Sequence, residues 1–387
     1  MAKEFKKWID EFVKNGANPK NVPNWPEEPG GAIELQDKTI IPSITTQRVV
    51  CDDNFDGLDT VTVEAVTRAI DENIVAENIK KDVNILGVTG TYEGSGTTYD
   101  VASLSTRLPQ KLDAMGVAQI GSNMYLFGGR GSNGDVNTIY KFDTDTETIS
   151  TLSATLPQKL DAMGVAQIGS NVYLFGGRGS NGDANTIYKF NTDAETVSTL
   201  SVTLPQTLYN MGVAQIGSNV YLFGGHREAK AHDTIYKFNA EAETISTLSV
   251  TLPQTLSGMG VAQIGSNVYL FGGVGSNGSV NDIYKFDTDT ETISTLSATL
   301  PRLLYSMGVA TFGSNVYLFG GFSTRAVNTI YKFNAKTETI STLSTILPKA
   351  FFNMSVAQMG SNVYLFGGLE KGISSKLYDI YKFSVDF

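Results

Sequence analysis

The sequence predicts an all-β protein, a six-bladed β-propeller of four-stranded antiparallel blades behind a small N-terminal region. One unit recurs six times, beginning at Leu108 and ending with Phe387, at a spacing of 48 residues that shortens to 47 once. Repeats of 40–50 residues that hold four strands are typical of propellers. The sixth copy lacks its last strand, whose counterpart, Tyr99–Ser105, stands before the first copy. A strand at the start of the chain that completes the last repeat predicts a closed ring.

Four strands can be identified in each copy, and we name them a to d from the axis outward. Strand a holds small residues, which suits the crowded centre, whereas the Ser/Thr-rich strand d suits the rim. Short connections predict an antiparallel meander. We expect Tyr99–Ser105 to pair as strand d with Asp379–Ser384. In the first copy the four strands are Met115–Ile120, Asn123–Phe127, Thr138–Phe142 and Thr148–Ser153.

Composition excludes several functions. Acidic side chains outnumber basic ones, 39 to 29, and no Lys/Arg cluster offers a phosphate-binding surface, so we expect no nucleic-acid partner. Cys51 is the single cysteine, which excludes an intrachain disulfide and a cysteine metal cage. No stretch approaches the roughly 20 apolar residues of a membrane span, so no membrane insertion is expected. The N-terminus does not resemble a signal peptide, which predicts synthesis in a cytoplasm without cleaved export.

The N-terminal region divides into three parts by composition. Residues 1–16 are predicted to form an amphipathic helix whose apolar stripe comprises Phe5, Trp8, Ile9 and Phe12. So short a helix must dock, either on its own protein or on a larger assembly. Residues 17–35 are a proline-rich linker, and residues 36–96 are a small β-rich module ahead of the propeller at 97–387.

The small β-rich module at residues 36–96 resembles a known group of proteins. Its run KTIIPS…FDGLDTVTVEAV…IDENIVAENIKKDVNILGVTGTYEG resembles a short module of structural, tail-type proteins of bacteriophages and prophages of Gram-positive bacteria, over roughly residues 36–93. Asp82 stands where that family often has Gly. The resemblance implies attachment to other virion proteins through the N-terminal region.

The repeats resemble the kelch family. Val172–Gly177 matches its hydrophobic strand with a double glycine, and Tyr188 and a Leu-Pro near the blade boundary match as well. Kelch repeats usually place a Trp at the start of strand d, where this chain has Ile or Val, as at Ile149. The copper enzymes among kelch proteins need Tyr, His and Cys ligands, and this ring has no Cys, so no cofactor is expected.

The copies disagree mainly in two regions. Copies one and two differ at six of 48 positions, so the later differences are informative. The link from strand d to strand a and the loop from b to c vary, whereas the a–b turn stays Gly-Ser-Asn in all copies. Both variable regions emerge at one end of the blade. A binding face is one interpretation, and neutral drift of tolerant loops is the other. The candidate face comprises Asp113, Arg130, Asp161, Arg178, Tyr209, His226, Arg227, Tyr305, Phe322, Arg325, Phe351 and Phe352.

Signals of catalysis and metal binding are weak. His226 and His232 lie in one loop with no further His or Cys ligand in the ring, which favours an ordinary surface loop. Asp143-x-Asp145-x-Glu147 resembles a calcium loop but has Lys336 inside its counterpart in copy five, so it is read as a c–d turn.

The sequence therefore predicts a non-enzymatic virion protein of a phage or prophage-derived particle. Its N-terminal region would attach it, and its propeller would contact a glycan or protein on the host surface. Two alternatives remain open: a head or tail decoration protein without receptor binding, and a kelch-like enzyme acting on glycans.

Overall fold

The computed structural model describes residues 97–180, 182–228, 230–370 and 375–386, with four short strands before them. The chain divides into two compact units, residues 1–96 and 97–387. In the first, β1 (Gln47–Val49) pairs with β2 (Val61–Val63), and β3 (Asn84–Ile85) with β4 (Val88–Thr89), both antiparallel. The predicted helix bearing Phe5, Trp8, Ile9 and Phe12, and the linker 17–35, lie outside the described residues.

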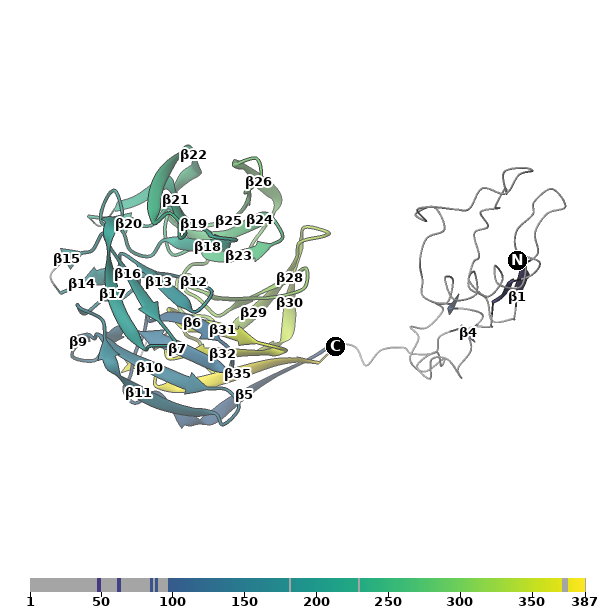
Figure 1. Cartoon of the computed structure of the whole chain (residues 1–387), viewed down its shortest axis with the longest axis horizontal. Helices are drawn as coiled ribbons and strands as arrows, with labels where there is room; N and C mark the ends of the chain where they lie inside the picture. Colours follow the sequence, from purple (N-terminus) through teal and green to yellow (C-terminus); the bar gives the residue numbers. More distant parts are fainter. Residues whose placement is uncertain are drawn as a thin grey trace, which may run out of the picture. The chain divides into compact units, whose positions relative to one another are not determined.

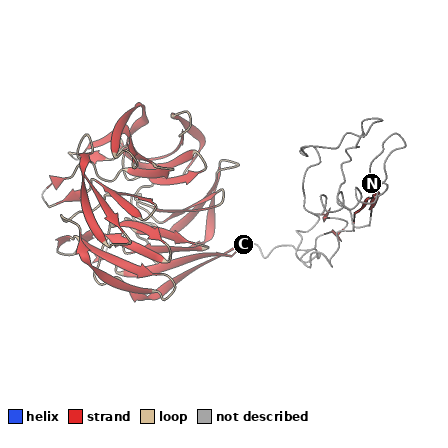
Figure 2. Ribbon diagram, viewed as in Figure 1, coloured by secondary structure: helices blue, strands red, loops and turns tan. Residues whose placement is uncertain are grey.

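The second unit confirms the predicted propeller of six four-stranded antiparallel blades, and its described residues are strands and loops (Figure 2). Blade 1 holds β6 (Gly116–Ile120), β7 (Asn123–Phe127), β10 (Thr138–Asp143) and β11 (Thr148–Thr155). Blade 2 holds β12 (Gly164–Ile168), β13 (Asn171–Phe175), β16 (Thr186–Asn191) and β17 (Thr196–Thr203). Blade 3 holds β18 (Gly212–Ile216), β19 (Asn219–Phe223), β21 (Lys230–Asn239) and β22 (Thr244–Leu256).

The other blades follow the same order. Blade 4 holds β23 (Gly260–Ile264), β24 (Asn267–Gly275), β25 (Gly278–Asp287) and β26 (Thr292–Thr299). Blade 5 holds β27 (Gly308–Phe312), β28 (Asn315–Phe319), β29 (Thr329–Asn334) and β30 (Thr339–Ile346). Blade 6 holds β31 (Ser355–Met359), β32 (Asn362–Phe366), β35 (Asp379–Asp386) and β5 (Thr98–Arg107). Short strands extend four b–c loops: β8 (Arg130–Gly131) with β9 (Gly134–Asp135), β14 (Arg178–Gly179) with β15 (Gly182–Asp183), β20 (His226–Arg227) with β21, and β33 (Leu369–Glu370) with β34 (Ser375–Lys376).

The ring is closed as predicted. The innermost strands contact their neighbours all the way round, and β31 of the last blade lies against β6 of the first. Strand β5 lies beside β35 (Figure 1). The two strands pair antiparallel, and Thr98 lies opposite Asp386. Because β5 comes from the start of the chain, the two ends of the propeller hold each other in one sheet.

Six hydrophobic cores lie between adjacent blades, one at each junction. At the first junction the ring of Phe190 inserts between Tyr125 and Phe127 of the preceding blade, with both centroid distances 5.3 Å. The Phe190–Phe127 pair is edge-to-face, a favourable aromatic geometry. Since each core needs two blades, no blade buries its apolar side chains alone.

We call the face formed by the a–b and c–d turns the turn face. It carries a series of ion pairs, each of which joins a lysine of one blade to a glutamate of the next. Lys141 Nζ lies 3.0 Å from Glu195 Oε1 of the next blade, and Lys382 Nζ lies 2.9 Å from Glu147 Oε1, which spans the last and first blades. Blade 5 differs, because Lys332 Nζ donates to the Tyr99 hydroxyl of β5 at 3.2 Å. Half-exposed pairs of this kind contribute about 0–1 kcal/mol each. The remaining pairs are Lys189–Glu243, Lys237–Glu291 and Lys285–Glu338.

Candidate functional site

The two variable regions meet on the opposite face, here the loop face. In every blade the variable residue of the d–a link forms an isolated antiparallel bridge with the residue that follows the Gly-Gly pair. In blade 1 the Arg130 amide donates to the Asp113 carbonyl at 2.8 Å. We call these twelve residues the belt. Its pairs are Asp113–Arg130, Asp161–Arg178, Tyr209–His226, Ser257–Val274, Tyr305–Phe322 and Phe352–Leu369.

A ring of backbone hydrogen bonds lies inside the belt. The residue after each d–a position donates its amide to the carbonyl of its counterpart one blade earlier, at 2.8–3.0 Å, and the series closes on itself. All of these residues have φ between 52° and 59°, the left-handed region that Gly and Asn tolerate best. We call them the floor ring: Ala114, Ala162, Asn210, Gly258, Ser306 and Asn353.

The belt and the floor ring enclose a depression of about 170 Å³ at the propeller axis. Its wall changes chemistry around the circle: charged over blades 1 and 2, mixed over blades 3 and 4, and aromatic over blades 5 and 6. The belt residues of this wall whose side chains are at least partly exposed are Arg130, Arg178, His226, Val274, Tyr305 and Phe352.

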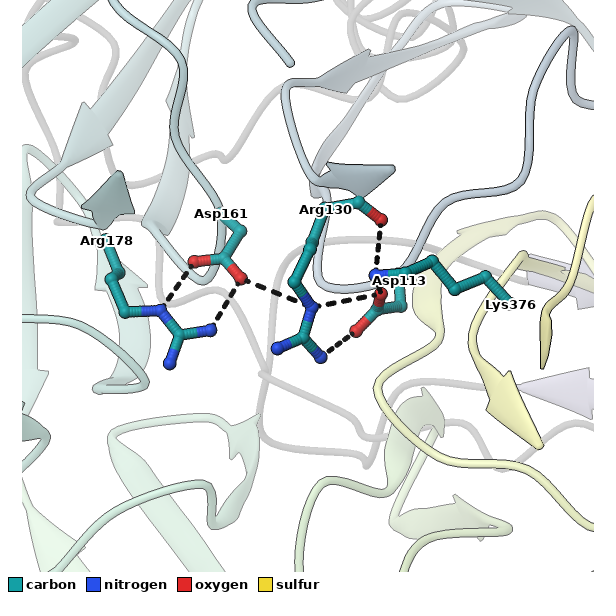
Figure 3. A network of polar contacts seen from close by, with 5 residues as sticks. All are labelled: Asp113, Arg130, Asp161, Arg178 and Lys376. Carbon is teal, nitrogen blue, oxygen red and sulfur yellow. Dashed lines mark hydrogen bonds and ion pairs between the residues drawn. The ribbon is translucent and has the colours of Figure 1, made fainter. Parts of the chain in front are cut away.

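The charged sector is a network across three blades (Figure 3). The Asp113 carboxylate is fully buried and accepts from Arg130 Nη2 at 2.7 Å and from Lys376 Nζ at 2.6 Å. The Asp161 carboxylate is 1% exposed, accepts from Arg178 Nη2 at 2.9 Å, and lies 3.9 Å from Arg130 Nε. Two buried carboxylates thus hold two arginines that are 33% and 39% exposed.

The pKa values of this sector follow from these contacts. The hydrogen bond from Arg130 to Asp113 raises the pKa of the guanidinium, so it stays charged. Burial raises the pKa of Asp161, and the hydrogen bond from Arg178 opposes that shift. Removing one partner would leave a buried charge unpaired, which typically costs about 3–5 kcal/mol.

The mixed sector continues the same pattern of contacts between blades. The Arg178 guanidinium lies 5.3 Å from the centre of the Tyr209 ring, within the range of a cation–π interaction. His226 Nε2 lies 3.2 Å from the Ser257 hydroxyl of the next blade. Burial lowers the pKa of His226, and the neighbouring His232 lowers it further.

The aromatic sector is a row of three rings. Phe322 is buried between Tyr305, at a centroid distance of 5.3 Å, and Phe352, at 4.9 Å. Tyr305 and Phe352 are half-buried and line the depression. The contacts with Phe322 therefore fix the positions of the Tyr305 and Phe352 rings, while one side of each of these two rings remains accessible.

Several candidate residues do not lie where the sequence analysis expected. Phe351 is not on the loop face: it is fully buried in the core between blades 5 and 6, at the position that Leu112 occupies in blade 1. Asp113, Asp161, Tyr209 and Phe322 are buried within the belt, because each contacts a neighbouring blade. Arg227 donates to Gln206, and Arg325 is exposed; neither lines the depression.

Other residues of the site were missed by the sequence analysis. Lys376 contacts Asp113 from the blade 6 hairpin, where the copies cannot be aligned residue by residue. Asn210, Ser306 and Asn353 of the floor ring also line the depression. At this position of the repeat the six copies have Ala, Ala, Asn, Gly, Ser and Asn. The Asn and Gly residues at this position indicate a left-handed backbone, and the sequence analysis could have used them.

The pKa of His226 predicts a pH effect on stability. Its folded pKa lies below the ordinary 6.5, so the unfolded chain takes up the proton first as pH falls. The stabilising contribution is complete above about pH 6.5 and is lost as pH falls toward the folded pKa. We expect His226→Val, which copies Val274 of blade 4, to reduce the fall in melting temperature between about pH 7.5 and 5.5. An unchanged fall would contradict this reading.

Two further properties concern the described residues as a whole. They include no helix long and apolar enough to cross a membrane. Within them, no three or more His, Cys, Asp or Glu side chains gather as a set able to hold a metal ion.

Comparison with known families agrees with this architecture. The model of the KLHDC2/KLHL20/DRC7 Kelch-repeats domain matches residues 95–208 and 258–386, which is more than half of the chain. The unmatched interval, 209–257, holds blade 3. No curated protein matches the chain. The chain belongs to the kelch-repeat family, as a KLHDC2/KLHL20/DRC7-type Kelch-repeats domain.

Proposed function

We propose that the protein is a non-enzymatic binding component of a bacteriophage or prophage-derived particle. Its N-terminal region attaches to other virion proteins, and the depression on the loop face binds the host surface. The family assignment supports a binding role, since kelch propellers often act as protein-binding modules. The phage context is supported by the resemblance of residues 36–93 to tail-type structural proteins.

The observation that carries this proposal is that the chain enters the propeller on the face opposite the one that holds the diversified residues. Thr98 at the start of β5 pairs with Asp386 near the end of β35, so the chain enters and leaves the propeller at its turn face. The depression opens on the loop face, with different side chains from each blade on a rigid ring. A module tethered on one side presents the other to a partner.

The attachment role is tested by deletion. In the source bacterium, particles induced from a strain lacking codons 1–96 should contain no propeller, while the full chain should be found by mass spectrometry. Incorporation of the truncated propeller at the level of the full chain would contradict N-terminal attachment.

The binding role is tested with labelled full-length protein on cells of the source species. Tyr305→Ser and Phe352→Ser copy Ser257, which the chain itself tolerates in blade 4, and together should abolish cell binding. The matched control is Asp289→Asn, an exposed change on the turn face. If full-length protein on particles does not bind cells, the decoration role is correct instead. Turnover of a surface glycan by the purified protein would overturn the non-enzymatic assignment.

A further inference from the structure

The depression is the size of one ring-shaped group. Its volume of about 170 Å³ suits a single sugar ring or one large side chain, and the floor ring bounds it beneath. The wall and floor come from all six blades, so the occupant would enter along the axis. A chain end or a terminal residue fits such an entrance better than the middle of a long polymer.

The charges around the depression are balanced only when a third carboxylate is counted: Asp113 and Asp161 contact Arg130, Arg178 and Lys376, and the nearby Asp135 acts electrostatically on Arg178. Arg130 and Arg178 each direct Nε and Nη2 at a buried carboxylate, and Lys376 is bound to Asp113 as well. Figure 3 shows one terminal nitrogen of each guanidinium without a partner among the residues drawn. The arginines therefore offer hydrogen-bond donors with little uncompensated charge. An anionic ligand would gain less here than at free arginines.

Neutral polar groups complete the floor and wall. Asn210, Ser306 and Asn353 line the depression, and their side chains make no hydrogen bond within the described part of the chain. Amide and hydroxyl groups both donate and accept, which suits a ligand that does the same. Tyr305 and Phe352, held by Phe322, supply an apolar surface on the other side.

We propose that the depression binds the terminal pyranose of an uncharged polysaccharide of the host surface. Sugar hydroxyls use the spare arginine donors and the floor amides, and one apolar sugar face packs on Tyr305 or Phe352. This proposal rests on the function proposed above and names the ligand chemistry of the same site. It assigns specificity to the free hydroxyls of one terminal ring.

The test uses saturation-transfer NMR on the full chain with glucose, galactose, mannose and N-acetylglucosamine, and with glucuronic and N-acetylneuraminic acids as anionic counterparts. At least one neutral sugar should bind with a Kd on the order of 1 mM, as expected for so small a ligand. At least one of Tyr305→Ser and Phe352→Ser should weaken it at least about tenfold, the loss of one apolar contact, while Asp289→Asn should not. Between about 0.05 and 0.5 M salt the Kd should stay within about twofold, because a neutral ligand is not screened.

Three outcomes would overturn the proposal. The first is binding confined to the acidic sugars and weakened by salt. The second is neutral-sugar binding unaffected by both Ser variants. The third is cell binding that no neutral sugar inhibits and that protease treatment of the cells abolishes, which would make the ligand a protein while leaving the binding function intact. Absence of cell binding altogether would instead overturn the function itself.

Discussion

A chain that begins after Arg107 will not form a stable monomeric propeller, whereas a chain that begins at Thr97 will. Strand β5 lies opposite β35 from Thr98 to Arg107, and its apolar side chains reach two cores. Tyr99 and Val101 pack between blades 5 and 6, and Leu104 packs between blades 6 and 1. Removing β5 exposes both cores and leaves an unpaired edge on β35. The loss approaches the whole stability of a typical domain, about 5–15 kcal/mol.

Circular dichroism and size-exclusion chromatography of the two truncated proteins measure this effect. The protein that begins at Thr97 should melt cooperatively, and the shorter one should aggregate or unfold without a sharp transition. A synthetic peptide of residues 97–107 should restore part of the transition by pairing with β35. A shorter protein that melts like the longer one would show that the first strand does not close the ring.

Gly176→Ala should destabilise the propeller strongly. Gly176 has φ +57°, and a Cβ there would strike the Leu208 carbonyl oxygen at the junction with blade 3. The same carbonyl accepts from the Gly177 amide at 2.8 Å, so moving it away would break that hydrogen bond. We expect a loss of about 4 kcal/mol or more, and a fall of roughly 10 °C in melting temperature.

Gly169→Ala is the matched control. Its φ is +60°, close to that of Gly176, but nothing lies within 4 Å of the added Cβ. Only the left-handed backbone is strained, at about 1–2 kcal/mol. Differential scanning calorimetry of both variants separates the clash from the backbone strain. Equal losses would mean that the double glycine serves backbone conformation alone.

The fold was accessible from the sequence because near-identical copies reveal element boundaries directly. Strand b of blade 1 was predicted at its observed bounds, and strands a, c and d within two residues. Closure of the ring was predicted from Tyr99–Ser105, the last strand of the repeat, which stands before the first copy. The short strands in the b–c loops were not predicted, because only two residues on each side pair and no alternating pattern marks them.

The site was predicted less completely. Variation between copies located the belt, but a variable residue can be buried against its neighbour as readily as it can face a ligand. The Asp–Arg combination of copies one and two is replaced at both positions in copy three, by Tyr209 and His226, which indicates contact within each pair. Burial depends on distance from the axis, which a repeat alignment does not contain. Phe351 was misplaced because it was read as a neighbour of Phe352 and not as the counterpart of Leu112.

The central claim is that the loop face, and not the turn face, meets the host surface. Hydroxyl-radical footprinting of the full chain on isolated envelopes of the source species tests it most directly, since the radical oxidises accessible aromatic and methionine side chains. Tyr305 and Phe352 should lose oxidation on binding, while Met359, half-buried beside an a–b turn, should keep it. Protection of Met359 with unchanged oxidation of Tyr305 and Phe352 would contradict the account.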